Sequence, residues 1–335
     1  FAKGDTNYDV DNMDFENVEL RVAFRFNNGS DTDGQAKWYY KALDEFNKEN
    51  EGKIHVTDES ISTESDYEEK LTTDFASGNV PNAFLQYGGS RTREYVDAGY
   101  ILDLTPYFEQ YPEWKEGVQD FAWETTQFDG IEGTYGIPWS AYQLCLYYNK
   151  DYLDQVGVDV PESWDDLVDA CAKLKDAGIT PMTMDDAYAT CVIGYHLARL
   201  VGEDKVKEIV TEGEWDDPAV LQMAQDIEEL ASNGYYSEMV GSNVWPAGQN
   251  TELALGTAAM YLNGSWLPNE VKEMAGPDFH WGCFAYPALT DGANGIETNN
   301  FGAQVFGINK DTKLAKEAFD LITFLSLIHI SEPTR

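Results

Sequence analysis

The sequence predicts an α/β fold of about two domains, in which helices cover the sheets. Its 335 residues suffice for about two domains that each bury a core of their own. Hydrophobic residues make up 43% and charged residues 24% of the chain, as in ordinary globular proteins. Segments with the two-residue period of a strand alternate with segments of helical period, and this alternation is typical of α/β layers.

The first region contains the order strand, helix, strand, helix, strand. Residues 18–26 alternate apolar and polar side chains, and residues 36–46 then repeat apolar side chains at helical spacing. A second strand begins at residues 54–56, and the helix that follows it ends at Gly78. Residues 83–87 are a short apolar strand before a glycine turn. This order predicts helices packed on a sheet.

A second region repeats the alternation. Ser163 begins a helix, because Asp166 stands three residues later and completes a capping box. Asp217 and Pro218 are a typical N-cap and first helical residue of another helix. The strands predicted in and after this region are 144–148, 179–184, 258–262, 279–286 and 304–309, and the last amphipathic helix covers 314–322.

The charge of the chain excludes two classes of partner. Asp and Glu number 60 against 22 Lys and Arg, which gives a formal net charge of −38. A surface this negative repels nucleic acid backbones and anionic lipid headgroups. We expect no nucleic-acid partner, whereas neutral and cationic ligands remain compatible with the charge.

Common catalytic and metal-binding motifs are missing from the sequence. It contains no P-loop, dinucleotide-binding, nucleophile-elbow or HExxH motif. His55, His196 and His280 are scattered, and residues 31–34 do not complete a calcium loop. The four cysteines lack zinc-site spacing and are expected to pack in the cores. We expect no catalytic residue, no cofactor and no metal, although 60 acids leave open a carboxylate pair for glycoside hydrolysis.

Aromatic residues follow predicted strands, where α/β proteins bind ligands. Tyr87 precedes the turn at residues 88–90, Trp139 and Tyr142 follow a Gly-Ile-Pro segment, and Trp266 lies in an Asn-Gly-Ser-Trp segment. An aromatic ring beside amides and carboxylates offers an apolar surface with hydrogen-bond partners, which suits a sugar. For each ring taken singly, packing in a core is an equal alternative.

Several motifs occur in the order found in one known family. They are YGIP at 135–138, YYNKD at 147–151, PESWDDL at 161–167, KLKDAGITP at 173–181, GTAAM at 256–260 and GSW at 264–266. In this order they resemble the bacterial extracellular solute-binding proteins of family 1, the maltose-binding-protein-like subunits of carbohydrate ABC importers. The resemblance extends from about Val18 to Phe324.

The resemblance implies a two-lobed periplasmic-binding-protein fold, type II-like, with crossing strands at a hinge and a ligand between lobes that close on it. One lobe would comprise residues 18–137 plus 288–310, and the other residues 138–287 plus 311–324. The implied chain crossings lie near residues 106–138 and 286–299. The implied ligand contacts are Tyr87, Ser90, Arg91, Trp139, Tyr142, Tyr188 and Trp266.

Two residues depart from the family pattern. Tyr142 stands where some sugar binders carry a carboxylate, and Asn82 stands where Asp commonly follows the proline. The first departure leaves the identity of the sugar open.

The two ends of the chain are interpreted separately. Residues 1–17 are polar and fit either a flexible tether left after leader removal or a trimmed terminus. Residues 325–335 resemble the translation of a sequencing adapter, so we expect helix packing to end after Phe324 and the C-terminus to be truncated.

The expected function is that of an exported sugar-binding subunit of an ABC importer, in the periplasm or at the extracellular face of the cell membrane. It would bind a mono- or oligosaccharide and deliver it to the permease subunits. Membrane attachment would depend on an N-terminal lipid anchor outside the given chain. Two alternatives are a glycoside-active enzyme with two carboxylates in the cleft, and the same fold binding a peptide, a polyamine or another cation.

Overall fold

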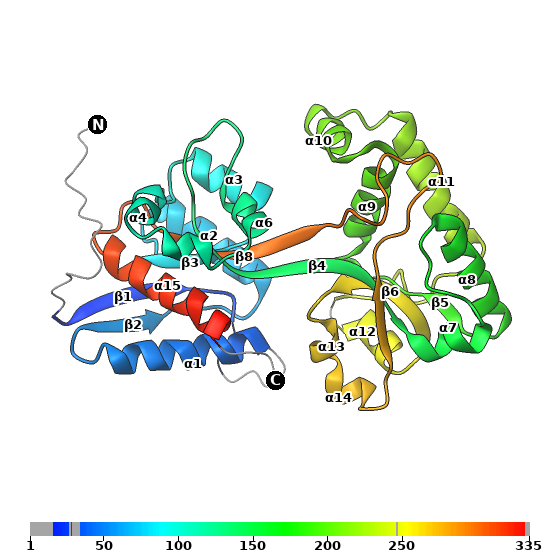
Figure 1. The fold of residues 1–335 in the computed structure, drawn as a ribbon, viewed down its shortest axis with the longest axis horizontal. Helices are drawn as coiled ribbons and strands as arrows, with labels where there is room; N and C mark the ends of the chain where they lie inside the picture. The colour runs from blue at the N-terminus through cyan, green and yellow to red at the C-terminus, as the bar shows by residue number, and fades with distance from the viewer. Residues whose placement is uncertain (1–15, 27, 29–33, 246, 332–335) are drawn as a thin grey trace. The chain divides into compact units, whose positions relative to one another are not determined.

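The computed structural model describes residues 16–26, 28, 34–245 and 247–331, with the backbone alone for residues 327–331. It divides the chain into two compact units (Figure 1). Unit 1 lies within Phe1–Ala141 and Gly302–Arg335, and unit 2 is Tyr142–Phe301. The chain therefore passes from unit 1 to unit 2 after Ala141 and returns after Phe301.

Unit 1 contains a mixed sheet with the strand order β2-β1-β3-β8. The strands are β1 (Val18–Ala23), β2 (Ile54–Asp58), β3 (Ala83–Gln86) and β8 (Phe301–Ile308). β1 pairs in parallel with β2 and β3, whereas β8 runs antiparallel to β3. Leu20, Phe84 and Phe306 are fully buried, one on each of β1, β3 and β8. The predicted strand, helix, strand order of this region is confirmed.

The helices of unit 1 are α1 (Gly34–Glu49), α2 (Glu64–Ser77), α3 (Gly89–Asp97), α4 (Thr105–Gln110), α5 (Glu113–Glu116), α6 (Asp120–Trp123), the 3-10 helix η1 (Glu124–Thr126) and α15 (Ala315–Ser331). α2 ends as predicted at Gly78, whose left-handed conformation suits a residue without a side chain.

Unit 2 is built around β4 (Ile137–Asn149), which begins in unit 1 and continues into unit 2. The other strands are β5 (Thr180–Met182), β6 (Ala258–Gly264) and β7 (Trp281–Phe284). β4 pairs antiparallel with β6 and with β7, and β5 pairs in parallel with β6. The carboxyl ends of β5 and β6 therefore lie at the same edge of this sheet.

The helices of unit 2 are α7 (Lys150–Val156), α8 (Trp164–Asp176), α9 (Ala189–Val201), α10 (Glu203–Glu212), α11 (Pro218–Ser232), α12 (Ala247–Ala254), α13 (Leu267–Glu270) and α14 (Lys272–Ala275). The capping box of Ser163 with Asp166 and the N-cap role of Asp217 are confirmed.

The final helix lies in unit 1, not in the second lobe, so the assignment of residues 311–324 is wrong. α15 packs beside α1 (Figure 1). The ring of Phe319 stacks on Tyr107 at 4.3 Å and on Trp114 at 5.2 Å between centroids. Residues 288–301 also differ from the prediction, since they belong to unit 2.

The prediction that packing ends after Phe324 is wrong for the next two residues. α15 continues through Ser331, and Leu325 and Ser326 are buried. The Ser326 hydroxyl donates to the carbonyl oxygen of Pro138 at 3.0 Å. The apolar residues within 327–331 lie outside the described side chains. So do most of residues 1–17 and most of the candidate calcium loop at 31–34.

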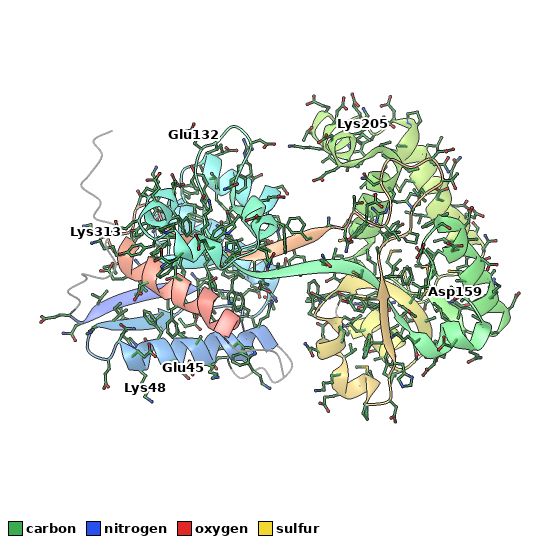
Figure 2. All side chains as sticks on the ribbon, in the orientation of Figure 1. Glu45, Lys48, Glu132, Asp159, Lys205 and Lys313 are labelled. Atoms are coloured by element: carbon green, nitrogen blue, oxygen red, sulfur yellow. The ribbon has the colours of Figure 1, made fainter. Side chains whose placement is uncertain are left out.

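Charged side chains cover the outside of both units. Figure 2 labels Glu45, Lys48 and Lys313 on unit 1 and Asp159 and Lys205 on unit 2, all directed outward. Cys171 is buried as expected, whereas Cys283 is exposed. No helix within the described ranges combines the length and the apolar character needed to span a membrane.

Candidate functional site

The candidate ligand contacts fall into two groups, one in each unit. Tyr87, Ser90, Arg91 and Trp139 belong to unit 1. Tyr142, Tyr188 and Trp266 belong to unit 2.

In unit 1, three of the candidates follow the carboxyl end of β3. Gly88 begins α3 with a φ of 65°, and a Cβ atom there would lie 2.8 Å from the Thr125 Cβ and carbonyl oxygen. A side chain would therefore disturb the turn, which explains the glycine. The turn leaves Ser90 exposed and Tyr87 half-buried.

Arg91 lies over the ring of Tyr87. Its guanidinium carbon is 4.0 Å from the ring centroid, a cation–π distance. The same guanidinium donates to Glu64 at 2.8 Å and to Glu68. Arg91 is therefore held in place from three directions, although its side chain is 45% exposed.

Trp139 lies in the core of unit 1, within β4 and not beyond a strand end as predicted. It is 8% exposed and packs between Phe26 at 5.3 Å and Phe306 at 5.2 Å. Core packing was the alternative for each aromatic residue, and it applies to Trp139.

In unit 2, the three remaining candidates come together. The ring centroid of Trp266 lies 5.3 Å from that of Tyr142 and 6.4 Å from that of Tyr188. All three rings are half-buried. Tyr188 follows β5 and Trp266 follows β6, so the shared carboxyl edge of these strands brings the rings together.

Trp266 has a defined position because its surroundings leave it little freedom. A Cβ atom on Gly264 would lie 2.1 Å from the indole, so only glycine allows the ring to cover the end of β6. The amide nitrogen of Gly264 donates to the side chain of Asn263 at 2.6 Å.

Buried amides hold the end of β6. The side-chain oxygen of Asn250 accepts hydrogen bonds from Tyr261 and Asn263, and its nitrogen donates to Glu270 at 2.9 Å. Asn263 and Tyr261 are fully buried. A satisfied buried network of this kind rigidifies the backbone that carries Trp266.

Two acids lie in the loop that leads from β5 to Tyr188. Asp185 is 2% exposed and accepts from the Tyr188 amide at 2.7 Å. Burial raises the pKa of Asp185 above its usual value, because the interior disfavours the charged form. The side chain of Asp186 accepts a hydrogen bond from the backbone amide of Trp245 at 3.0 Å.

Trp245 was missed in the sequence analysis. It precedes α12 and is half-buried beside the loop that carries Tyr188. Glu252 connects the segment after β5 with the segment before α12. It accepts hydrogen bonds from Thr183 at 2.5 Å and from Asn243 at 2.7 Å. Nothing in the local sequence pattern signals this long-range contact.

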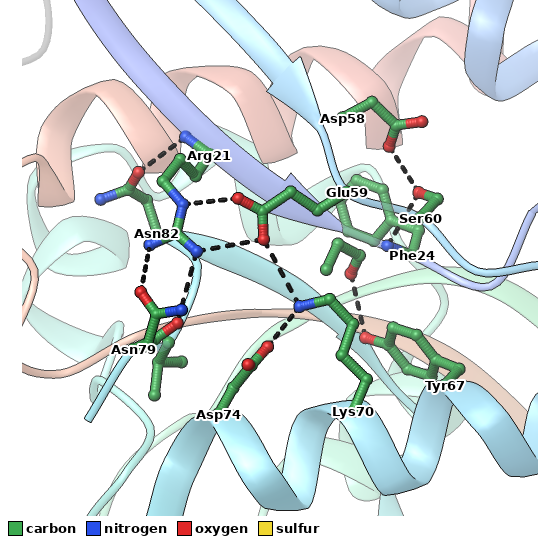
Figure 3. Close-up of polar contacts among 12 residues, drawn as sticks. Arg21, Phe24, Asp58, Glu59, Ser60, Tyr67, Lys70, Asp74, Asn79 and Asn82 are labelled. Atoms are coloured by element: carbon green, nitrogen blue, oxygen red, sulfur yellow. Dashed lines mark hydrogen bonds and ion pairs between the residues drawn. The ribbon is translucent and has the colours of Figure 1, made fainter. Parts of the chain in front are cut away.

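The departure at Asn82 concerns the backbone of unit 1. Figure 3 shows Asn82 beside Arg21, whose amide donates to the Asn82 side chain at 2.7 Å. The Asn82 amide group also donates to Thr312 at 2.7 Å. Asn82 stands before β3, at the end opposite to Tyr87, so it does not contribute to the candidate site.

The site can offer aromatic surface and neutral or acidic hydrogen-bond partners. Among the described residues, no group of three or more His, Cys, Asp and Glu could hold a metal ion. The unit 2 group offers an apolar aromatic surface beside the carboxylates of Asp185 and Asp186.

Comparison with known proteins decides the family. The model of the bacterial extracellular solute-binding protein family matches residues 28–327. The chain belongs to this family. This solute-binding protein is 27% identical over 314 residues to the multiple sugar-binding protein of Streptococcus mutans, which covers 90% of the chain and 70% of that relative. The chain spans 61% of another relative, a binding protein of Brucella abortus that is 28% identical over 262 residues.

Solved structures share the two-lobed fold. A chitin oligosaccharide binding protein matches with a TM-score of 0.74 and 26% identity, over 91% of this chain and 76% of that chain. RafE, solved in complex with raffinose, matches with a TM-score of 0.71 over 92% of this chain and 77% of that chain. At 23% identity, the second likeness concerns the fold alone. The predicted family and fold class are confirmed.

Proposed function

We propose that this solute-binding protein is the sugar-capturing subunit of an ABC importer, which binds a mono- or oligosaccharide and delivers it to the membrane permease. It would act outside the cytoplasmic membrane, held there by an N-terminal lipid anchor, and would perform no chemistry of its own. The proposal extends to the whole protein what the family and its relatives suggest.

The observation that carries the proposal is the group of Tyr142, Tyr188 and Trp266 at one edge of the unit 2 sheet. Three half-buried rings in contact supply apolar surface for the C–H faces of a sugar ring. Asp186, in the loop that leads to Tyr188, adds a carboxylate that can accept from hydroxyls. The sugar-binding relative and the chitin oligosaccharide binding protein support the same class of ligand.

Thermal unfolding with a panel of raffinose, chitotriose, maltotriose and D-galactose tests the proposal. A ligand present at 100 times its dissociation constant adds about 2.7 kcal/mol to the free energy of unfolding. We expect at least one sugar to raise the melting temperature, and calorimetric titration then gives its affinity. A rise with spermidine or a peptide and with none of the sugars would instead favour the non-sugar alternative.

The enzyme alternative needs a separate measurement. The protein is incubated with the same oligosaccharides, and the solution is analysed by chromatography for shorter products. We expect the sugars to remain intact. Release of shorter sugars that increases with protein concentration would contradict a pure binding role.

A further inference from the structure

A small cavity lies at the carboxyl end of β3, next to Tyr87 and Arg91. Its volume is about 30 Å³, whereas one water molecule needs about 10 to 15 Å³ measured in the same way. The polar residues that line it are Glu68, Gln86, Arg91 and Thr92, with the rings of three tyrosines around them. Glu68 and Arg91 have side chains 46% and 45% exposed, so the cavity lies next to the surface.

Two of the residues that line this cavity each carry a buried polar atom that lacks a hydrogen-bond partner within the described part of the chain. These atoms are Oε1 of Gln86, which is 3% exposed, and Oγ1 of Thr92, which is 1% exposed. Gln86 is held in one orientation, because its Nε2 donates to the carbonyl oxygen of Tyr135 at 2.7 Å. Buried polar atoms normally have partners, and leaving one unpaired destabilises the folded state. These two atoms therefore call for a functional explanation.

We propose that this cavity is a subsite that receives one hydroxyl or hydroxymethyl group of the bound sugar. The inference depends on the proposed sugar-binding function. A hydroxyl donates one hydrogen bond and accepts two, so a single hydroxyl can donate to Gln86 Oε1 and accept from Thr92 Oγ1. A carboxylate has no proton for Gln86 Oε1, and an ammonium group has no acceptor for the proton of the Thr92 hydroxyl.

The position of the cavity agrees with this assignment. Gln86 is the last residue of β3, and Thr92 lies one turn into α3. The chain between them carries Tyr87, Ser90 and Arg91, three of the candidate contacts of unit 1. A group bound in the cavity would therefore belong to the same ligand that these residues contact.

Replacement Thr92→Val tests the subsite, because it removes the unpaired oxygen and preserves the shape of the side chain. We expect the melting temperature of the free protein to stay the same or rise, since no internal hydrogen bond is lost. Affinity for the sugar that binds tightest in the panel should fall about tenfold, the effect of one lost hydrogen bond of about 1.4 kcal/mol. If Thr92 had a merely structural role, the variant would melt at a lower temperature and bind the sugar with unchanged affinity.

Thr323→Val is the matched control. Thr323 is 2% exposed in α15, and its hydroxyl donates to the carbonyl oxygens of Phe319 and Asp320 at 2.7 and 2.9 Å. This variant should lower the melting temperature and leave the affinity unchanged. If Thr92→Val behaves like Thr323→Val, the subsite assignment is wrong.

Deoxy analogues of the tightest-binding sugar identify the hydroxyl that enters the cavity. One analogue should bind the native protein more weakly by about tenfold and bind the Thr92→Val variant as well as the parent sugar does. Equal affinity of the sugar for native and variant protein would overturn the subsite and leave the proposed function intact. If no sugar of the panel binds the native protein, the sugar-binding function fails, and the subsite fails with it.

Discussion

At the scale of single residues, the two tryptophans of the predicted site have different surroundings. Trp266 is half-buried and touches two other rings, whereas Trp139 is 8% exposed in the core of unit 1. We expect Trp266→Ala to weaken sugar binding by about 2 kcal/mol or more, which is about thirtyfold in dissociation constant. Calorimetric titration measures the loss of affinity.

Trp139→Ala is the comparison variant. Truncation of a core tryptophan removes about 3–5 kcal/mol from the free energy of unfolding, so this variant should melt much earlier than Trp266→Ala. Unchanged affinity together with a collapsed melting temperature for Trp266→Ala would show that its indole belongs to the core of unit 2.

Two histidines in unit 2 should respond to acid in opposite directions. Burial lowers the pKa of His196, which lies between Asp226 at 2.8 Å and the Tyr286 hydroxyl at 3.0 Å, although Asp226 opposes the shift. Asp151, 2.7 Å away, raises the pKa of the exposed His280. The unfolded value of both is about 6.5.

The sign of each effect follows from proton uptake. Below about pH 6.5 the unfolded chain protonates at His196 before the folded protein does, so acid destabilises the fold there. Below the same pH, the protonated His280 stabilises the folded state through Asp151. This contribution disappears as the pH rises through the raised pKa of His280. Urea unfolding at pH 7.5 and 5.5 should show a smaller acid loss for His196→Gln than for the native protein, and a larger one for His280→Gln. Shifts of the same sign in both variants would contradict this account.

At the scale of secondary-structure elements, α8 tests how much a predicted cap contributes. The Ser163 hydroxyl accepts from the Asp166 amide at 3.2 Å, and the Asp166 side chain accepts from the Ser163 amide at 3.0 Å. Ser163→Ala should lower the free energy of unfolding by about 1 kcal/mol, as measured by urea denaturation. Ser232→Ala, at the exposed end of α11, should change it by less than about 0.5 kcal/mol. Equal effects would mean that the cap adds nothing specific.

Elements defined by local patterns could be predicted, and those defined by distant contacts could not. The β3 strand and the turn after it follow from a short apolar run and glycines. α9 is rich in apolar residues, and its charged or titratable residues His196 and Arg199 are buried, so its buried face does not follow the apolar pattern. Arg199 donates to the carbonyl oxygens of Tyr286 and Thr298, contacts about 90 residues or more away along the chain.

The candidate site shows the same limit. Glycine turns and strand ends identified Tyr87 and Trp266, because these signals lie within a few residues. Trp139 follows a similar signal, but β4 continues through it into unit 2 and its ring enters the core. The backbone amide of Trp245 donates to Asp186, 59 residues away, and this contact has no local signal in the sequence.

At the scale of the whole molecule, the division into units could be predicted only in part. α15 follows β8 along the chain, and its buried residues Phe319 and Leu325 find their partners in unit 1. A sequence pattern shows that a helix has an apolar face but not which sheet or helix the face covers. The assignment of residues 311–324 failed for that reason.

The net charge of −38 should make stability depend on salt. Repulsion among like charges destabilises the compact state. An increase of ionic strength from about 10 to 150 mM shortens the screening length from about 30 to 8 Å. We expect the melting temperature to rise over this range of NaCl, where a protein stabilised mainly by surface ion pairs would show a fall.

Lys205 provides a local test of the same effect. Its ammonium group lies 2.7 Å from Glu214, 3.1 Å from Glu208 and 3.6 Å from Asp217, so Lys205→Gln leaves three acids without their shared cation. Lys48→Gln changes the net charge equally, but Lys48 forms no ion pair with any residue that the structure describes. We expect Lys205→Gln to melt earlier than Lys48→Gln at 10 mM NaCl and the gap to narrow at 150 mM, because screening weakens the repulsion among the three acids. A gap that stays constant with salt would show that Lys205 acts through packing of its stem and not through its charge.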